Sequence, residues 1–111
     1  MGQKLYLIKN DKYRLDIEAF NNDEFERIKE GRIKYNYRFS IKEKLSEGAL
    51  ESYDANVVIT SKGDKIGFNL KTSLDFGMYL YVIEKINVKK ESVEELAYGF
   101  IEILPDIVLN I

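Results

Sequence analysis

The segment SVEELAYGFIEILPDIVLNI, residues 92–111, decides the fold that we expect for this chain. Ser92 and Glu95 form a capping box, in which each side chain accepts a hydrogen bond from a free backbone amide of the first helical turn. Apolar residues then recur at helical spacing to the last residue: Val93, Leu96, Phe100, Ile103, Leu104, Ile107 and Ile111. Pro105 removes one helical hydrogen bond, so we expect a kink or break near Ile101. The segment predicts one C-terminal helix.

Upstream, apolar and polar residues alternate in the manner of β-strands. The clearest case is residues 32–45, where Ile33, Tyr35, Tyr37, Phe39 and Ile41 share one face. The other strand-like segments are residues 4–8 and 13–19, which fit either two strands or one strand broken by a turn at Asn10-Asp11. Residues 52–60 and 66–76 are two more, joined by a tight hairpin at 61–64. Residues 21–31 are charged and fit a loop or one helical turn.

Gly77 interrupts this alternation, and residues 78–83 are apolar on both faces. A glycine inside a strand often marks a bulge or bend. A strand that is apolar on both faces is either central to a sheet or part of an oligomer interface. At 111 residues the chain forms one domain, residues 1–111. We therefore predict an α+β fold, an antiparallel sheet of about four long strands with one face covered by the C-terminal helix.

Composition narrows the possible chemistry. Histidine and cysteine are both absent, which removes the usual general base, the thiol nucleophile and structural zinc. Neighbouring carboxylates such as Glu94-Glu95 are better explained by the helix dipole. We therefore expect no enzyme activity, no cofactor and no metal. The absence of cysteine and of a long apolar span fits a soluble, cytoplasmic protein without membrane insertion.

Nucleic-acid binding is not expected either. The net charge is −2. A basic strip on residues 32–45 falls on the face opposite Tyr35, Tyr37 and Phe39, whereas sheet-based RNA binders place aromatic and basic residues on the same face. The strip consists of Lys34, Arg38, Lys42 and Lys44. A solvated face explains it better.

Five residues are candidates for contact with a polypeptide client or for assembly: Tyr37, Phe39, Met78, Tyr79 and Tyr81. Aromatic and methionine side chains on a surface bind extended polypeptide adaptably. The same residues could equally form the core beneath the helix. Both interpretations stay open, because a sheet covered by one helix leaves part of its apolar surface exposed.

Two segments resemble the SecB-like family of protein-export chaperones and their small relatives. Residues 68–82, FNLKTSLDFGMYLYV, are similar to that family's alternating strand followed by a glycine and an aromatic-rich strand. Residues 96–111 resemble its first long helix, which carries a proline after an apolar pair. The chain departs from the pattern at Phe76, where the family usually has an acidic residue, and the family's second helix and metal-binding tail are missing after Ile111. The resemblance implies a dimer of dimers that holds unfolded chains in apolar grooves.

The sequence thus favours a chaperone-type polypeptide-binding module, independent of ATP and metal, that holds unfolded, export or antitoxin clients and forms a homo-oligomer, dimer or tetramer. The alternative is a bacterial or phage inhibitor or immunity protein that binds one folded partner through charged surface. An enzyme that uses carboxylates or tyrosine is a more distant possibility.

Overall fold

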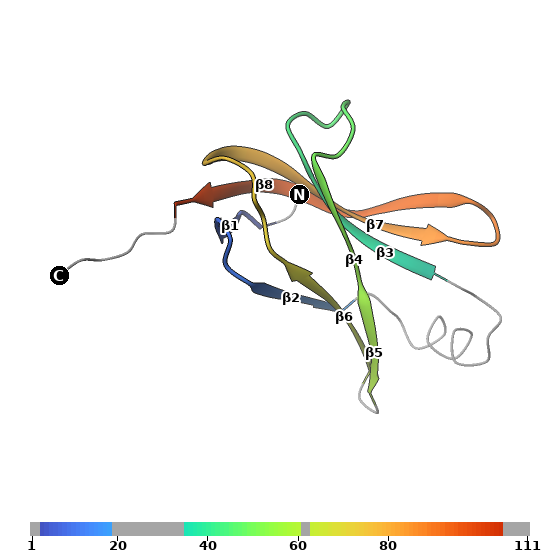
Figure 1. Ribbon diagram of the computed structural model, residues 1–111. Helices are drawn as coiled ribbons and strands as arrows, with labels where there is room; N and C mark the ends of the chain where they lie inside the picture. The colour runs from blue at the N-terminus through green and yellow to red at the C-terminus, as the bar shows by residue number, and fades with distance from the viewer. Residues whose placement is uncertain (1–2, 19–34, 61–62, 106–111) are drawn as a thin grey trace.

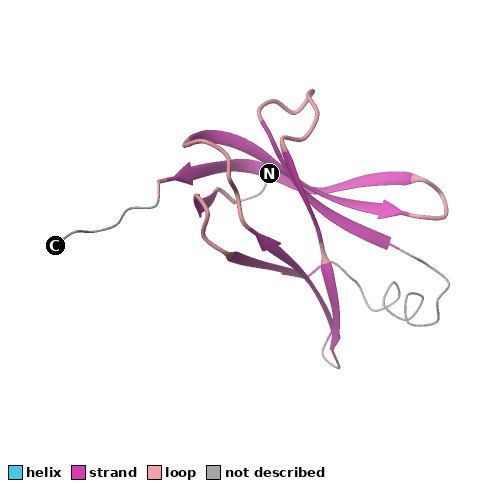
Figure 2. Ribbon diagram, viewed as in Figure 1, coloured by secondary structure: helices cyan, strands magenta, loops and turns pink. Residues whose placement is uncertain are grey.

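The computed structural model describes residues 3–18, 35–60 and 63–105, and every regular element among them is a β-strand (Figure 1 and Figure 2). In chain order the strands are β1 (Leu5–Ile8), β2 (Tyr13–Glu18), β3 (Tyr35–Lys42), β4 (Glu51–Asp54), β5 (Asn56–Thr60), β6 (Gly63–Leu70), β7 (Gly77–Asn87) and β8 (Ser92–Leu104). The predicted α+β fold is therefore wrong, because the described part of the chain is all-β.

The strands form two sheets. The larger has the order β1-β8-β7-β3-β4 and the smaller the order β2-β6-β5. Strands β1 and β8 run parallel, and the other described pairs are antiparallel. The chain passes between the sheets at the turn after β1, at Ala55 between β4 and β5, and at residues 71–76 between β6 and β7. Figure 1 shows β4 and β5 as nearly one ribbon that runs from the larger sheet into the smaller.

The core lies between the two sheets and is centred on Phe39, whose side chain is fully buried. Its ring stacks on Tyr81 at a centroid distance of 5.5 Å and lies 5.8 Å from the ring of Phe68 in the smaller sheet. The other buried members of this cluster are Leu7, Tyr37, Ile41, Ile66, Leu70, Ile83 and Ile101. Each large apolar side chain buried here contributes roughly 1.5–3 kcal/mol. The smaller sheet thus covers the face of the larger sheet that we had assigned to a helix.

Several sequence-based predictions are confirmed. The hairpin pairs β5 with β6 in antiparallel register. Asn10, with φ of 67°, separates β1 from β2, and the amide of Asp11 donates to the carbonyl of Ile8 at 3.1 Å. Gly77 begins β7 with φ of 148°, a left-handed conformation that favours glycine. The segment that is apolar on both faces lies in β7, the central strand of the larger sheet.

The predicted C-terminal helix is instead strand β8 as far as Leu104. The pairing of β7 with β8 changes register between Ile83 and Glu84, so that Leu96 has no partner and forms a β-bulge. A bulge reverses which residues face outward. Odd-numbered residues before it and even-numbered residues after it therefore share one face of the sheet, which carries Val93, Leu96, Phe100 and Leu104. Their spacing of three, four and four residues imitates a helical stripe.

The capping box has another explanation as well. Ser92 begins β8 after the short loop of residues 88–91, in which Glu91 has φ of 52°. The side-chain oxygen of Asn87 accepts hydrogen bonds from the amides of Lys89 and Lys90, both at 3.1 Å, and so stabilises the turn. The signal for a β-hairpin was therefore the asparagine before the loop, whereas Ser92 and Glu95 suggested a helix start.

Pro105 follows the last residue of β8, where it ends the strand without a helical kink. The helical half of the SecB-like resemblance loses its support as far as Leu104, and residues 106–111 lie outside the described residues. What remains of the resemblance is the sequence pattern of residues 68–82, where strand β6 ends at Leu70 and β7 begins at Gly77, and it stays a prediction.

Other boundaries differ from the prediction. The strand expected at residues 52–60 is divided at Ala55 between the two sheets, and the strand expected at 66–76 ends at Leu70. Strand β3 begins at Tyr35, and residues 32–34 lie outside the described part of the chain, as do residues 21–31. Within β3 the predicted alternation is confirmed from Asn36 to Phe39, with Tyr37 and Phe39 buried and Arg38 exposed.

A hydrogen-bonded cluster around Glu51 joins β4 of the larger sheet to the link between β6 and β7. Its carboxylate accepts hydrogen bonds from the Thr72 hydroxyl at 2.6 Å and from the amide and hydroxyl of Ser73, both at 3.2 Å. The Tyr53 hydroxyl lies 3.0 Å from Glu51 Oε1 and 2.8 Å from the carbonyl oxygen of Lys71, so its one proton serves either acceptor. We call these residues the Glu51 cluster. It fixes the link between β6 and β7 against β4.

Candidate functional site

The five residues predicted to bind clients lie on β3 and β7 but do not share one accessible surface. Tyr37, Phe39 and Tyr81 are 2%, 0% and 3% exposed and belong to the core. The Tyr81 hydroxyl donates to the carbonyl of Gln3, and burial raises the pKa of this tyrosine. Tyr79 is partly buried against the core, and its hydroxyl donates to the carbonyl of Asp75 at 2.9 Å. Met78, at 50% exposed, is the member that reaches solvent.

Met78 belongs to a larger apolar surface on the side of the larger sheet that faces away from the core. We call it the outer apolar face. Its exposed members come from β1, β7 and β8 and are Tyr6, Ile8, Met78, Val93, Leu96, Tyr98 and Phe100. Their exposed fractions lie between 36% and 57%. Contiguous apolar patches of this kind on a small domain usually mark a surface that binds another molecule.

The strand registers place these side chains next to one another. Tyr6 and Met78 both lie opposite Glu102, one on each side of it. Phe100 is opposite Leu80, and Tyr98 is opposite Val82, which is only 4% exposed. Directly opposed side chains in a sheet have Cβ atoms about 4.5–5.5 Å apart. Apolar side chains of β1, β8 and β7 therefore lie close together, with the Glu102 side chain between Tyr6 and Met78.

Charged groups lie within and beside the outer apolar face. Lys4 Nζ lies 3.1 Å from Glu102 Oε1 and 4.8 Å from the centre of the Tyr6 ring. The hydrogen bond to Glu102 is the main reason that the pKa of Lys4 is raised. On β3 the exposed Arg38 is opposite Glu84 of β7. The surface therefore combines exposed apolar side chains with charged groups that lie among them as well as beside them.

Sequence reasoning missed most of this surface. The sequence pattern predicts a helix for four of its members, Val93, Leu96, Tyr98 and Phe100. It predicts only a short strand around Tyr6. A usable signal was present, because residues 96–103 also alternate at period two, with Leu96, Tyr98 and Phe100 against small or buried residues at 97, 99 and 101. That pattern predicts a strand that carries large apolar side chains on one face and small or buried side chains on the other.

The described residues offer little for other chemistry. No group of three or more Asp or Glu residues that could hold a metal ion occurs within residues 3–18, 35–60 and 63–105. A helix able to cross a lipid bilayer is likewise missing from the part of the chain described here. Comparison of the sequence with models of known protein families finds no match, and comparison with curated proteins finds no relative. The exposed apolar side chains of the larger sheet are therefore the candidate site on this all-β domain.

Proposed function

We propose that the protein is a non-catalytic polypeptide-binding module of the chaperone type, independent of ATP and metal, which holds its client on the outer apolar face. The observation that carries this proposal is the exposure of seven large apolar side chains on one side of the larger sheet. Covering apolar area releases roughly 25 cal/mol per Å². Exposed aromatic residues and methionine supply most of that area here, and such residues are enriched at binding surfaces.

The binding surface differs from the groove between sheet and helix that the sequence suggested, since β8 takes the place of the helix. A client would instead lie across β1, β8 and β7 and contact Tyr6, Phe100 and Met78. We further propose that the protein acts in the cytosol and forms a homo-oligomer. The cytosolic location is proposed from the absence of cysteine. The homo-oligomer is proposed from the apolar side chains exposed on the hairpin of β7 and β8.

One observation favours a second candidate, an inhibitor or immunity protein with one folded partner. The apolar side chains project from hydrogen-bonded strands, so their relative positions are fixed by the registers. A fixed array matches one folded surface well, whereas adaptable client binding benefits from mobile side chains and loops. A panel of unfolded and folded proteins separates the two: weak binding to several unfolded chains supports the chaperone, and tight binding to a single folded protein supports the inhibitor.

The direct test places a charge in the outer apolar face. We expect Met78→Glu and Phe100→Glu each to weaken binding of a reduced, carboxymethylated unfolded protein by about tenfold, a loss of about 1.4 kcal/mol. Fluorescence anisotropy of the labelled client gives the dissociation constants. Leu50→Glu is the matched control, because Leu50 is 47% exposed but lies in the loop between β3 and β4.

Circular dichroism would first show that all three variants keep the fold. Binding that is unchanged in Met78→Glu and Phe100→Glu, or lost equally in Leu50→Glu, would refute the assignment of this face. Failure of the wild-type protein to bind any unfolded chain would refute the chaperone-type function itself.

A further inference from the structure

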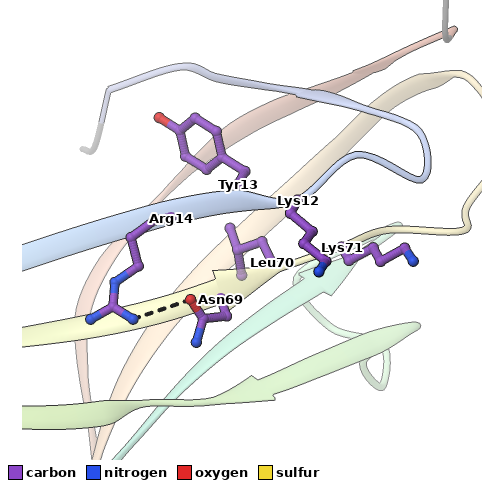
Figure 3. Close-up of a pocket in the computed structure, with 6 residues that line it drawn as sticks. All are labelled: Lys12, Tyr13, Arg14, Asn69, Leu70 and Lys71. Atoms are coloured by element: carbon purple, nitrogen blue, oxygen red, sulfur yellow. Dashed lines mark hydrogen bonds between the residues drawn. The ribbon is translucent and has the colours of Figure 1, made fainter.

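A second surface carries chemistry of a different kind. Where β2 begins and β6 ends, a pocket of about 530 Å³ opens to solvent (Figure 3). Its lining residues are Lys12, Tyr13, Arg14, Asn69, Leu70 and Lys71. Three of the six are cations and none is a carboxylate, although the whole chain has a net charge of −2. Asp16 pairs with Arg14 just outside this lining, so the excess positive charge of the pocket comes from Lys12 and Lys71.

The guanidinium of Arg14 is held in place by its neighbours. Its Nε donates to Asp16 Oδ1 at 2.8 Å, and its Nη1 donates to Asn69 Oδ1 at 3.1 Å, the bond drawn dashed in Figure 3. These bonds use two of the five N–H groups that arginine carries. The group also lies directly over Gly67, since a Cβ atom there would be 1.8 Å from Arg14 Nη2. Glycine at position 67 therefore creates the space in which the guanidinium lies flat against β6.

The two lysines lie at the same end of this strand pair, Lys12 directly before β2 and Lys71 directly after β6 (Figure 3). Tyr13 and Leu70 are the last pair of the β2–β6 register, and Lys12 and Lys71 each lie one residue beyond it. In Figure 3 the side chains of Lys12 and Arg14 extend to the same side of the strand pair, and Lys71 lies at its end. Two ammonium groups at the same end of a strand pair repel each other. An anion bound between them would relieve this repulsion.

We propose that this pocket binds a small anion that carries phosphoryl groups, such as a diphosphate. A fixed guanidinium binds two phosphate oxygens through parallel N–H groups, and the two ammonium groups supply point charges that a polyvalent anion neutralises. The pocket lies on the smaller sheet and the outer apolar face on the larger sheet. The proposal is therefore independent of client binding.

Pyrophosphate is the probe, and the assay is the shift of backbone amide resonances of the full chain during titration at low salt. We expect saturable shifts at residues 12–14 and 69–71. The double variant Lys12→Gln/Lys71→Gln should bind pyrophosphate at least about tenfold more weakly. The double variant Lys89→Gln/Lys90→Gln is the matched control, since it removes two exposed lysines from the loop between β7 and β8 and should bind as the wild type does.

Gly67→Ala gives a second, independent variant, because the added methyl group displaces the Arg14 guanidinium. We expect it to weaken pyrophosphate binding while both lysines remain. The lysine variants change exposed side chains, so they test the site even where Gly67→Ala fails to fold. The proposal would be overturned if the Lys12→Gln/Lys71→Gln and Lys89→Gln/Lys90→Gln variants lost pyrophosphate binding equally. Resonance shifts scattered over all surface lysines would overturn it as well, as would sulfate binding as tight as pyrophosphate binding.

Discussion

The Glu51 cluster gives a stability prediction whose size follows from the structure. In Glu51→Ala, the buried Thr72 hydroxyl and the Ser73 amide and hydroxyl lose their carboxylate acceptor. A hydrogen bond to a charged group contributes about 1.5–3 kcal/mol, and a neutral one about 0.5–1.5 kcal/mol. Ser73 is exposed and can bond water instead, and Tyr53 keeps the Lys71 carbonyl as acceptor. We therefore expect a loss of about 2–3 kcal/mol, most of it from Thr72.

Urea unfolding followed by far-ultraviolet circular dichroism measures this change. Glu43→Ala is the matched control, because Glu43 is exposed in the neighbouring loop, and it should alter the free energy of unfolding by less than about 0.5 kcal/mol. A loss below about 0.5 kcal/mol in Glu51→Ala would refute the reasoning, since it would show that the cluster does not hold the link to β4.

The pH dependence supplies a second test of the same cluster. Burial raises the pKa of Glu51, but the hydrogen bonds from Thr72, Ser73 and Tyr53 outweigh it and lower the pKa below its ordinary value of 4.5. The unfolded chain therefore binds the proton more readily than the folded one. The stability from Glu51 is present above pH 4.5 and is lost as the pH falls through the folded-state pKa. The difference in the free energy of unfolding between wild type and Glu51→Ala should therefore shrink as the pH falls over that range. A difference that stays constant with pH would contradict this account.

Three further predictions use the same unfolding assay. Gly77→Ala should cost about 1–3 kcal/mol because φ is 148° there, whereas Gly48→Ala, with open space around it, should cost less than about 0.5 kcal/mol. Phe39→Ala should cost about 3–5 kcal/mol, since it removes the ring at the centre of the core. Asn87→Ala should cost about 1 kcal/mol, because the amides of Lys89 and Lys90 lose their acceptor. The first prediction would be contradicted if Gly48→Ala lowered the free energy of unfolding as much as Gly77→Ala does. The second would be contradicted by a loss below about 1 kcal/mol in Phe39→Ala, and the third by an unchanged free energy of unfolding in Asn87→Ala.

The Glu51 cluster also predicts which tyrosine ionises late. Burial, followed by the hydrogen bond to Glu51, raises the pKa of Tyr53 to about 12. Tyrosine absorbance during alkaline titration should therefore lose one late component in Tyr53→Phe.

Local sequence predicted those parts of the fold that depend on neighbouring residues. The alternation in β3 and the β5–β6 hairpin both arise within a few residues, so the pattern at period two was sufficient. The division of the predicted strand at Ala55 and the parallel pairing of β1 with β8 depend on contacts between distant parts of the chain. No local pattern encodes such a pairing, because it joins Leu5 to Ile101.

The candidate site was predicted only in part for a related reason. Tyr37, Phe39 and Tyr81 have the composition of a binding surface, but their parity within β3 and β7 turns them toward the smaller sheet. Met78 has the opposite parity to Tyr81 and therefore faces outward. Sequence alone gave the alternation but not the second sheet, so it could not show which face is covered.

The error at residues 92–104 and the proposed function have the same physical origin. A strand in a one-sided sheet normally carries polar residues on its outer face, and such a pattern is easily recognised. Strand β8 instead has apolar residues on both faces, with Tyr98 and Phe100 on the outer side and Ile101 and Ile103 on the core side. Because the bulge at Leu96 also shifts the alternation by one residue, the apolar positions of the strand recur at helical spacing. The smaller sheet covers one side. The apolar residues on the other side would gain stability if a bound polypeptide covered them, which is the role that the proposed function gives to this face.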